Sequence, residues 1–311
     1  MRRANILVHP DLDRVAHLRG DGGWLAARLG EAATRLYPVW RNQSFVTGPQ
    51  EAPVAATIPA DAGWWRPIAA ETALMGTTAG AVHMAVDVGD LEDPARHPGL
   101  AARGRFADLR MIGGLMPDED AALCAHARAI LWWNRQHRFC GACGGATTAS
   151  QAGYARRCGN PACGIQHFPR TDAAVIVLIH DGDRILLGRQ RGWPHGMHSV
   201  LAGFLEPGES LEGCVAREVK EESGIDVTDI RYHSSQPWPF PQSLMVGFTA
   251  RAVTTTITVD PEELETAGWY ARDFLAAAPR EPRRGADFYL PRRISIARRL
   301  IEDWLAGEIE L

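Results

Sequence analysis

Residues 203–225, GFLEPGESLEGCVAREVKEESGI, constrain this chain more than any other segment. Glu209 and Ser210 place hydrogen-bond acceptors and negative charge where a helix can begin. Gly224 follows at the position where a left-handed residue commonly ends a helix. The segment therefore predicts a helix over about residues 210–223.

Three glutamates share one face of this predicted helix. Glu218, Glu221 and Glu222 are spaced i, i+3 and i+4, so their carboxylates form one stripe and repel one another unless a cation lies among them. The other side carries an apolar row that can dock on a sheet, formed by Leu211, Val215 and Val219. Clustered oxygen ligands suit Mg²⁺ or Mn²⁺. For three glutamates alone, the alternative is a solvated acidic surface.

The whole segment fits a longer pattern: Gly, five residues, Glu, seven residues, Arg-Glu, an aliphatic residue, any residue, Glu-Glu, any residue, Gly, and an aliphatic residue. Its fixed positions are Gly203, Glu209, Arg217, Glu218, Val219, Glu221, Glu222, Gly224 and Ile225. This pattern resembles the Nudix box, the signature of hydrolases that cleave a nucleoside diphosphate linked to another group. The resemblance implies an α/β/α sandwich with a mixed sheet and a loop-helix-loop metal site.

The resemblance also implies a role for each box residue. Glu218 and Glu222 would be ligands of the catalytic metal. Backbone carbonyls at Ala202 or Gly203 would complete the ligand set. Arg217, paired with Glu209, would hold the loop and orient the carboxylates. Glu221 or Glu222 would act as the general base, and the sequence does not choose between them.

A stiff aromatic segment, SQPWPFPQS at residues 235–243, follows the box. Three prolines remove backbone donors, while Trp238 and Phe240 offer flat faces for stacking on a base. Taken alone, the segment is equally a proline-rich surface turn or a polyproline ligand. At this distance after the box it resembles the substrate-selectivity motif of the NADH pyrophosphatase branch. The implied contact residues are Gln236, Pro237, Trp238, Pro239, Phe240, Pro241, Gln242, Ser243 and Met245.

This second resemblance implies a reaction. NADH or NAD⁺ would be cut at its pyrophosphate into nicotinamide mononucleotide and AMP, and the same branch removes NAD caps from RNA 5′ ends. One alternative is another Nudix substrate, such as ADP-ribose or a diadenosine polyphosphate, and SQPWPFPQS argues against it. A second alternative is a nucleotide- or RNA-binding sensor. The complete carboxylate set and the lack of a basic run at a net charge of −4 argue against that.

Two close cysteine pairs predict a zinc ribbon. Cys140 and Cys143 form the first pair, and Cys158 and Cys163 form the second. Two such knuckles suit a tetrahedral Cys₄ site, and four thiolates leave no open position, so this zinc would be structural. Disulfides are the competing interpretation, although nothing indicates an oxidising compartment. Members of the resembled branch often carry such a ribbon before the Nudix domain, usually with a shorter second knuckle.

Further positions follow from the branch resemblance. Glu263 would supply a metal ligand from outside the box, unless it is a charged residue opening a turn. Phe168 and Phe204 would sandwich a ring of the dinucleotide, unless they belong to the core. Ala297 would contact substrate through its backbone, and Arg110 would reach it from the N-terminal domain. Relatives of this type commonly form homodimers.

The 311 residues suffice for more than one core. We expect a small β-rich N-terminal domain at 1–137, a ribbon at 138–169 and a Nudix domain at 170–311. Asp118 is expected to cap a helix over 119–137, and a last helix is expected over 292–306. Strands are expected at 173–180, 184–188, 199–204, 227–234 and 243–252. With no signal peptide or apolar span, the expected location is the cytoplasm, with no membrane partner.

Overall fold

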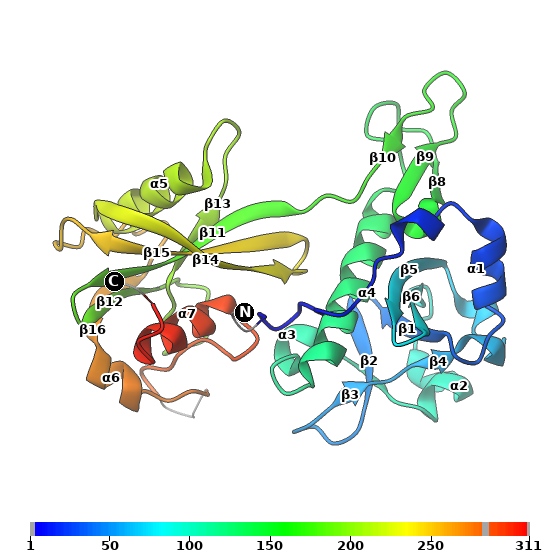
Figure 1. Ribbon diagram of the computed structural model, residues 1–311, viewed down its shortest axis with the longest axis horizontal. Helices are drawn as coiled ribbons and strands as arrows, with labels where there is room; N and C mark the ends of the chain where they lie inside the picture. Colours follow the sequence, from blue (N-terminus) through cyan, green and yellow to red (C-terminus); the bar gives the residue numbers. More distant parts are fainter. Residues whose placement is uncertain (1–3, 282–285, 310–311) are drawn as a thin grey trace. The chain divides into compact units, whose positions relative to one another are not determined.

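The computed structural model describes residues 4–281 and 286–309, and its contacts divide the chain into two compact units (Figure 1). The first unit comprises Met1–Thr171 together with Trp238–Gln242. The second comprises Asp172–Pro237 and Ser243–Leu311. The loop Trp238–Gln242 therefore packs with the unit that precedes it in sequence, although it connects two strands of the other one.

The second unit is built on a mixed sheet. Strand order is β14-β15-β11-β12-β16, and β13 pairs with β11. Strands β11 and β15 are parallel, while β13 and β12 run antiparallel to β11. The elements are β11 Asp172–Asp181, β12 Arg184–Arg189, β13 Leu201–Phe204, α5 Leu211–Ser223, β14 Val227–Trp238, β15 Ser243–Ala252, β16 Thr266–Ala271, α6 Arg272–Ala277 and α7 Ile296–Leu305.

Alternation along β11 explains why helices cover both faces of this sheet. Val175, Val177 and Ile179 pack with the apolar side of α5. The residues between them, Ile176 and Leu178, pack with α6 and α7. Successive side chains of a strand point to opposite faces, so a continuous apolar run requires cover on both sides. The expected α/β/α sandwich with a mixed sheet is confirmed.

The box helix α5 has the bounds that its sequence predicts. The Ser210 hydroxyl accepts a hydrogen bond from the Gly213 amide at 3.0 Å. At the other end Gly224 adopts a left-handed conformation with φ of 73°. Both end signals are local, so they act in the fold as they do in the sequence.

Some other predicted bounds differ. Helix α4 starts at Asp118, with Pro117 rather than Asp118 at the capping position. Helix α7 starts at Ile296, where the Ser295 hydroxyl accepts from the Ala297 amide. Strand β14 continues to Trp238 instead of ending at 234. It tolerates Pro237 because it lies at the edge of the sheet, where a missing amide donor is harmless.

The first unit contains a second mixed sheet with order β3-β2-β1-β6-β5, to which β4 and β7 add through β1 and β2. The long helix α4 packs on one face through Leu123, Ile130 and Trp133, and the other face holds a separate apolar cluster. This agrees with the expected β-rich domain. Its elements are α1 Gly22–Arg28, β1 Arg35–Trp40, β2 Gln43–Thr47, β3 Val54–Ala55, β4 Ile58–Pro59, β5 Glu71–Thr78, β6 Ala81–Asp87, α2 Pro98–Ala101, β7 Arg105–Ala107, α3 Leu109–Ile112 and α4 Asp118–Gln136.

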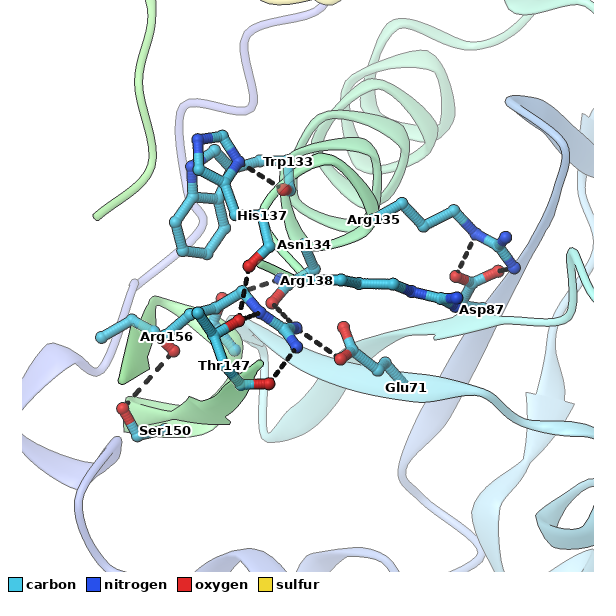
Figure 2. A network of polar contacts seen from close by, with 12 residues as sticks. Glu71, Asp87, Trp133, Asn134, Arg135, His137, Arg138, Thr147, Ser150 and Arg156 are labelled. Carbon is cyan, nitrogen blue, oxygen red and sulfur yellow. Dashed lines mark hydrogen bonds and ion pairs between the residues drawn. The ribbon is translucent and has the colours of Figure 1, made fainter. Parts of the chain in front are cut away.

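A small ribbon completes the first unit, with strands β8 Thr147–Ser150, β9 Ala155–Cys158 and β10 Gln166–His167. Figure 2 shows how a buried arginine joins it to the rest of the unit. Arg156, only 4% exposed, donates to the Asn134 side chain at 3.0 Å and forms an ion pair with Glu71. The ribbon, α4 and β5 therefore share one polar network.

Within the described residues, every helix is too short or too polar to cross a membrane.

Candidate active site and zinc centre

The box glycine brings backbone against a carboxylate. Gly203 lies on β13, paired with Val175 of the central strand β11. A Cβ atom at Gly203 would lie 1.9 Å from the carboxyl carbon of Glu218. No real Cβ contact is that short, so only glycine leaves room for this carboxylate. The glycine thus allows the Glu218 carboxylate to lie directly against the backbone of β13.

Arg217 organises the acidic side chains around it. It forms a two-pronged pair with Glu209, with Nε and Nη2 donating at 2.6 and 2.9 Å. Nη1 lies 3.0 Å from Glu218 and 2.9 Å from Glu221. The bond from Arg217, helped by the Glu206 amide, lowers the pKa of Glu209 to about 2. Arg217 thus pairs with Glu209, as the resemblance implies, and it also contacts Glu218 and Glu221; its orienting role stays a prediction.

Glu222 is the exceptional carboxylate of the site. It is 3% exposed, and its Oε2 atom has no hydrogen-bond partner among the described residues. Burial raises its pKa to about 8, and repulsion from Glu218 and Glu263 adds to this effect. Burial also raises the pKa of Glu218, against the opposing influence of Arg217. A buried carboxylate without a partner is costly, so this geometry favours a cation beside it.

Backbone hydrogen bonds hold the segment that precedes Glu263 against the end of α5. The Asp260 amide donates to the Glu222 carbonyl at 3.2 Å, and the Thr258 amide donates to the Ser223 carbonyl at 2.8 Å. These bonds tie the segment before β16 to the end of α5. Glu263 follows, and its charge raises the pKa of both Glu218 and Glu222. Glu263 is therefore near enough for its charge to act on Glu218 and Glu222, and its role as a metal ligand stays a prediction.

The donor set fits a hard divalent cation. In the predicted set, Glu218, Glu222 and Glu263 would supply carboxylate oxygens, and Ala202 or Gly203 would supply a backbone carbonyl. The unpartnered Glu222 oxygen and the close approach at Gly203 are the features that such an ion would explain. By contrast Glu221, with 56% of its side chain exposed, already pairs with Arg217. Among the residues that the structure describes, the carboxylate oxygens of this site lie further apart than the sulfurs of the four ribbon cysteines.

A polar cavity of about 310 Å³ lies beside Glu263. Its lining comes from two loops, at Gln190–Gly192 and Pro261–Leu264. Pairing of β12 with β16 brings these loops together, and a 2.9 Å ion pair between Arg189 and Glu265 holds them. Arg191 contributes a cation to this lining. No local pattern in the sequence marks Arg191, because the residues that face it in this cavity are about 70 positions away.

The remaining predicted contacts are distributed over both units. Phe204 in the second unit and Phe168 in the first are 60% and 63% exposed, so neither belongs to a core. Gln236 is buried, and its side-chain amide joins the Ile294 carbonyl and the Ile296 amide at 2.9 and 2.8 Å. Ala297 is also buried. The substrate roles of these residues stay predictions.

The SQPWPFPQS loop gives a different result from the open platform that the sequence suggests. Phe240 is only 9% exposed. Arg110 and Arg128 each place a guanidinium carbon 4.9 Å from the centre of its ring. Trp238 meets the same ring edge-on at 4.9 Å between centroids. Phe240 therefore offers no free stacking face, while Trp238 remains half-buried.

The four ribbon cysteines converge as a metal site. Their sulfurs all lie within 4.8 Å of one another, with pairs at 3.5 and 3.8 Å. Thiolates at the usual Zn–S distance around a tetrahedral ion would be about 3.8 Å apart. The longer second knuckle folds into a turn in which the Cys163 amide donates to Asn160 at 2.9 Å. The turn thus absorbs the extra residues and returns Cys163 to the cluster.

Three consecutive segments of this chain match models of known protein families. Residues 169–289 match the NUDIX domain, 135–168 the NADH pyrophosphatase zinc ribbon domain, and 33–133 the NADH pyrophosphatase-like rudimentary NUDIX domain. A protein named NAD-capped RNA hydrolase NudC from Mycobacterium bovis is 39% identical over 99% of this chain and 97% of its own length. This chain belongs to the NADH pyrophosphatase branch of the Nudix hydrolases. The expected family, enzyme class and zinc ribbon are therefore confirmed.

Two further relatives support the placement in this branch. A Stutzerimonas stutzeri protein of the same name is 44% identical over 71% of this chain and 73% of its own length. A Macaca fascicularis protein named NAD-capped RNA hydrolase NUDT12 is 42% identical over 61% of this chain and 43% of its own length. In this Nudix hydrolase, the oxygen atoms at the box suit a divalent metal, and the four cysteines of the ribbon suit a structural zinc ion.

Replacing Gly203 tests the close approach at the box. In Gly203→Ala the new methyl group must displace the Glu218 carboxylate. We expect kcat to fall by on the order of 10²-fold, as when one preorganised electrostatic group is lost. Thermal unfolding checks folding. Gly22→Ala is a matched control, because nothing lies within 4 Å of its Cβ position. If Gly203→Ala turned over substrate as fast as Gly22→Ala, the close approach of Glu218 to Gly203 would not matter for activity.

Proposed function

We propose that this Nudix hydrolase cleaves the pyrophosphate bond of NADH and NAD⁺ to nicotinamide mononucleotide and AMP, and removes NAD caps from RNA 5′ ends. The observation that carries the proposal is the complete acidic site around Glu222 in a chain that also has SQPWPFPQS. The names of the relatives support the same bond as the target. Free dinucleotide and capped RNA present that bond in the same chemical setting.

We further propose Mg²⁺ or Mn²⁺ as the catalytic ion, held by Glu218, Glu222, Glu263 and a carbonyl at Ala202 or Gly203. Such an ion, when bound, neutralises the diphosphate and lowers the pKa of water. Arg217 keeps the carboxylates in place through its bonds to Glu209 and Glu218. It does so before substrate arrives, so no reorganisation is needed during the reaction.

We propose Glu222 rather than Glu221 as the proton acceptor. Glu221 is engaged with Arg217, whereas the Glu222 Oε2 atom has no partner in the described part of the chain. A water proton passes to Glu222, and the water oxygen forms a bond to phosphorus. The bridging P–O bond breaks, and the leaving phosphate keeps its electron pair.

The direct test is incubation of the purified protein with NADH and either Mg²⁺ or Mn²⁺, followed by chromatography. We expect AMP and reduced nicotinamide mononucleotide, with faster turnover than on ADP-ribose or diadenosine polyphosphate. A mixture of NADH and NAD-capped RNA then ranks the two substrates by competition. Absence of cleavage with both metals would exclude the proposed substrates.

Three expectations from the sequence complete the proposal. We propose the domain bounds 1–137, 138–169 and 170–311, a homodimer, and action in the cytoplasm. Light scattering on the purified protein tests the dimer, which predicts twice the chain mass of 34.0 kDa.

A further inference from the structure

One arginine contacts the SQPWPFPQS loop through both a backbone carbonyl and an aromatic ring. Arg128 projects from the middle of α4, and its Nε donates to the Pro239 carbonyl at 2.7 Å. Its Nη1 donates to the Asn42 carbonyl. The same guanidinium lies over the Phe240 ring. A planar, forked cation can make all three contacts at once, which lysine cannot.

Both ends of this link are stiff. Asn42 belongs to the two-residue turn between β1 and β2, where Arg41 and Asn42 have φ of 46° and 69°. Such left-handed pairs form the tight hairpin turns that suit strand twist. At the other end, the prolines of the loop have no amide N–H to donate, which leaves carbonyls and ring faces as places where a side chain can attach. Arg128 uses one of each.

The two aromatic residues of the loop, Phe240 and Trp238, differ in burial and in contacts. Phe240 is buried under the guanidinium groups of Arg110 and Arg128, so it serves as an anchor. Trp238 packs edge-on against Phe240 at an interplanar angle of 72°, and it is the less covered ring. The orientation of Phe240 therefore sets the surface against which Trp238 packs.

We propose that Arg128 is a positioning residue for dinucleotide recognition. It acts through Pro239 and Phe240 to orient the ring of Trp238 toward nicotinamide, the second base of the dinucleotide substrate. This inference rests on the proposed function, since it assumes that SQPWPFPQS reads the dinucleotide. It also gives Arg110 a different task from the direct substrate contact expected from sequence. Both arginines would act on the anchor ring.

The test compares Arg128→Ala with Arg135→Ala in the full-length enzyme. Arg135 lies two turns further along α4 and pairs with Asp87 at 2.5 Å, so its loss perturbs the same helix without touching the loop (Figure 2). For Arg128→Ala we expect KM for NADH to rise about 10-fold or more with kcat nearly unchanged, because binding of the second base is lost. The preference for NADH over ADP-ribose, which lacks that base, should fall by a similar factor.

Two further variants make the result specific. Phe240→Leu keeps apolar volume but removes the ring face, and should reproduce the loss of preference. Arg128→Lys keeps the charge without the fork, and should restore KM only in part. An unchanged preference in Arg128→Ala, an equal change in Arg135→Ala, or full activity of Arg128→Lys would each overturn the inference. Failure of the wild type to cleave NADH would instead count against the proposed function.

Discussion

Glu222→Gln folds normally and loses on the order of 10²-fold or more in kcat on NADH. Glutamine keeps the shape of the side chain, but it cannot accept the water proton and is a poor ligand for a hard cation. Glu221→Gln is the matched control, because it changes the neighbouring carboxylate, which is exposed and paired with Arg217. Steady-state kinetics with both metals measures the difference. Equal losses in the two variants would remove the special role of Glu222.

Glu222→Gln lowers activity, but the same substitution should make the protein without catalytic metal more stable at high pH. The folded-state pKa of Glu222 is about 8, against an ordinary value of 4.5. The folded state therefore favours the protonated form, whose stabilising contribution is complete below pH 4.5 and is lost as pH rises toward 8. The two values differ by about 3.5, which corresponds to at most about 5 kcal/mol. Glutamine carries no charge at any pH in this range.

The expected result is a difference in thermal stability between the wild type and Glu222→Gln that grows with pH. Below pH 4.5 wild type and Glu222→Gln should unfold at similar temperatures, and above pH 8 the variant should be the more stable. Added Mn²⁺ should raise the unfolding temperature of the wild type at pH 8 but have little effect on the variant. Calorimetry of zinc-loaded protein, with and without Mn²⁺, measures both. Identical pH profiles would contradict the burial of an unpartnered carboxylate.

Loss of zinc is the second large effect. Cys158→Ser should abolish the bound zinc and unfold the ribbon, since structural zinc contributes on the order of 10 kcal/mol to small sites. The damage should spread, because Arg156 joins the ribbon to Asn134 of α4 and to Glu71 of β5 (Figure 2). We expect the first unit to unfold at a temperature lower by about 10 °C or more.

Two variants identify the fourth ligand. Cys163 closes the thiolate cluster, but the Nε2 atom of His167 lies only 3.3 Å from the Cys140 sulfur. Cys163→Ser should lose zinc, while His167→Ala should keep one zinc per chain. Cys124→Ala is the control, since this buried thiol lies outside the cluster. Zinc analysis showing the reverse order would assign the site to three cysteines and a histidine.

The sequence by itself determined the local features of this protein. The bounds of α5 follow from Ser210 and Gly224, which act on adjacent backbone groups. The cysteine pairs and SQPWPFPQS are equally contiguous, and so they identified the ribbon and the branch. The sandwich was implied by the resemblance of the box to the Nudix family, and the apolar run of β11, whose alternating side chains are covered on both faces, agrees with it.

Only the tertiary structure decided how neighbouring residues differ. Glu221 and Glu222 are adjacent on one acidic stripe, yet one is exposed and the other buried, because the segment before β16 bonds to the end of α5. The cavity at Arg191 exists because β12 pairs with β16. Phe240 is an anchor because Arg110 and Arg128, more than 100 positions away, meet it. Such contacts depend on long-range pairing, which no local pattern encodes.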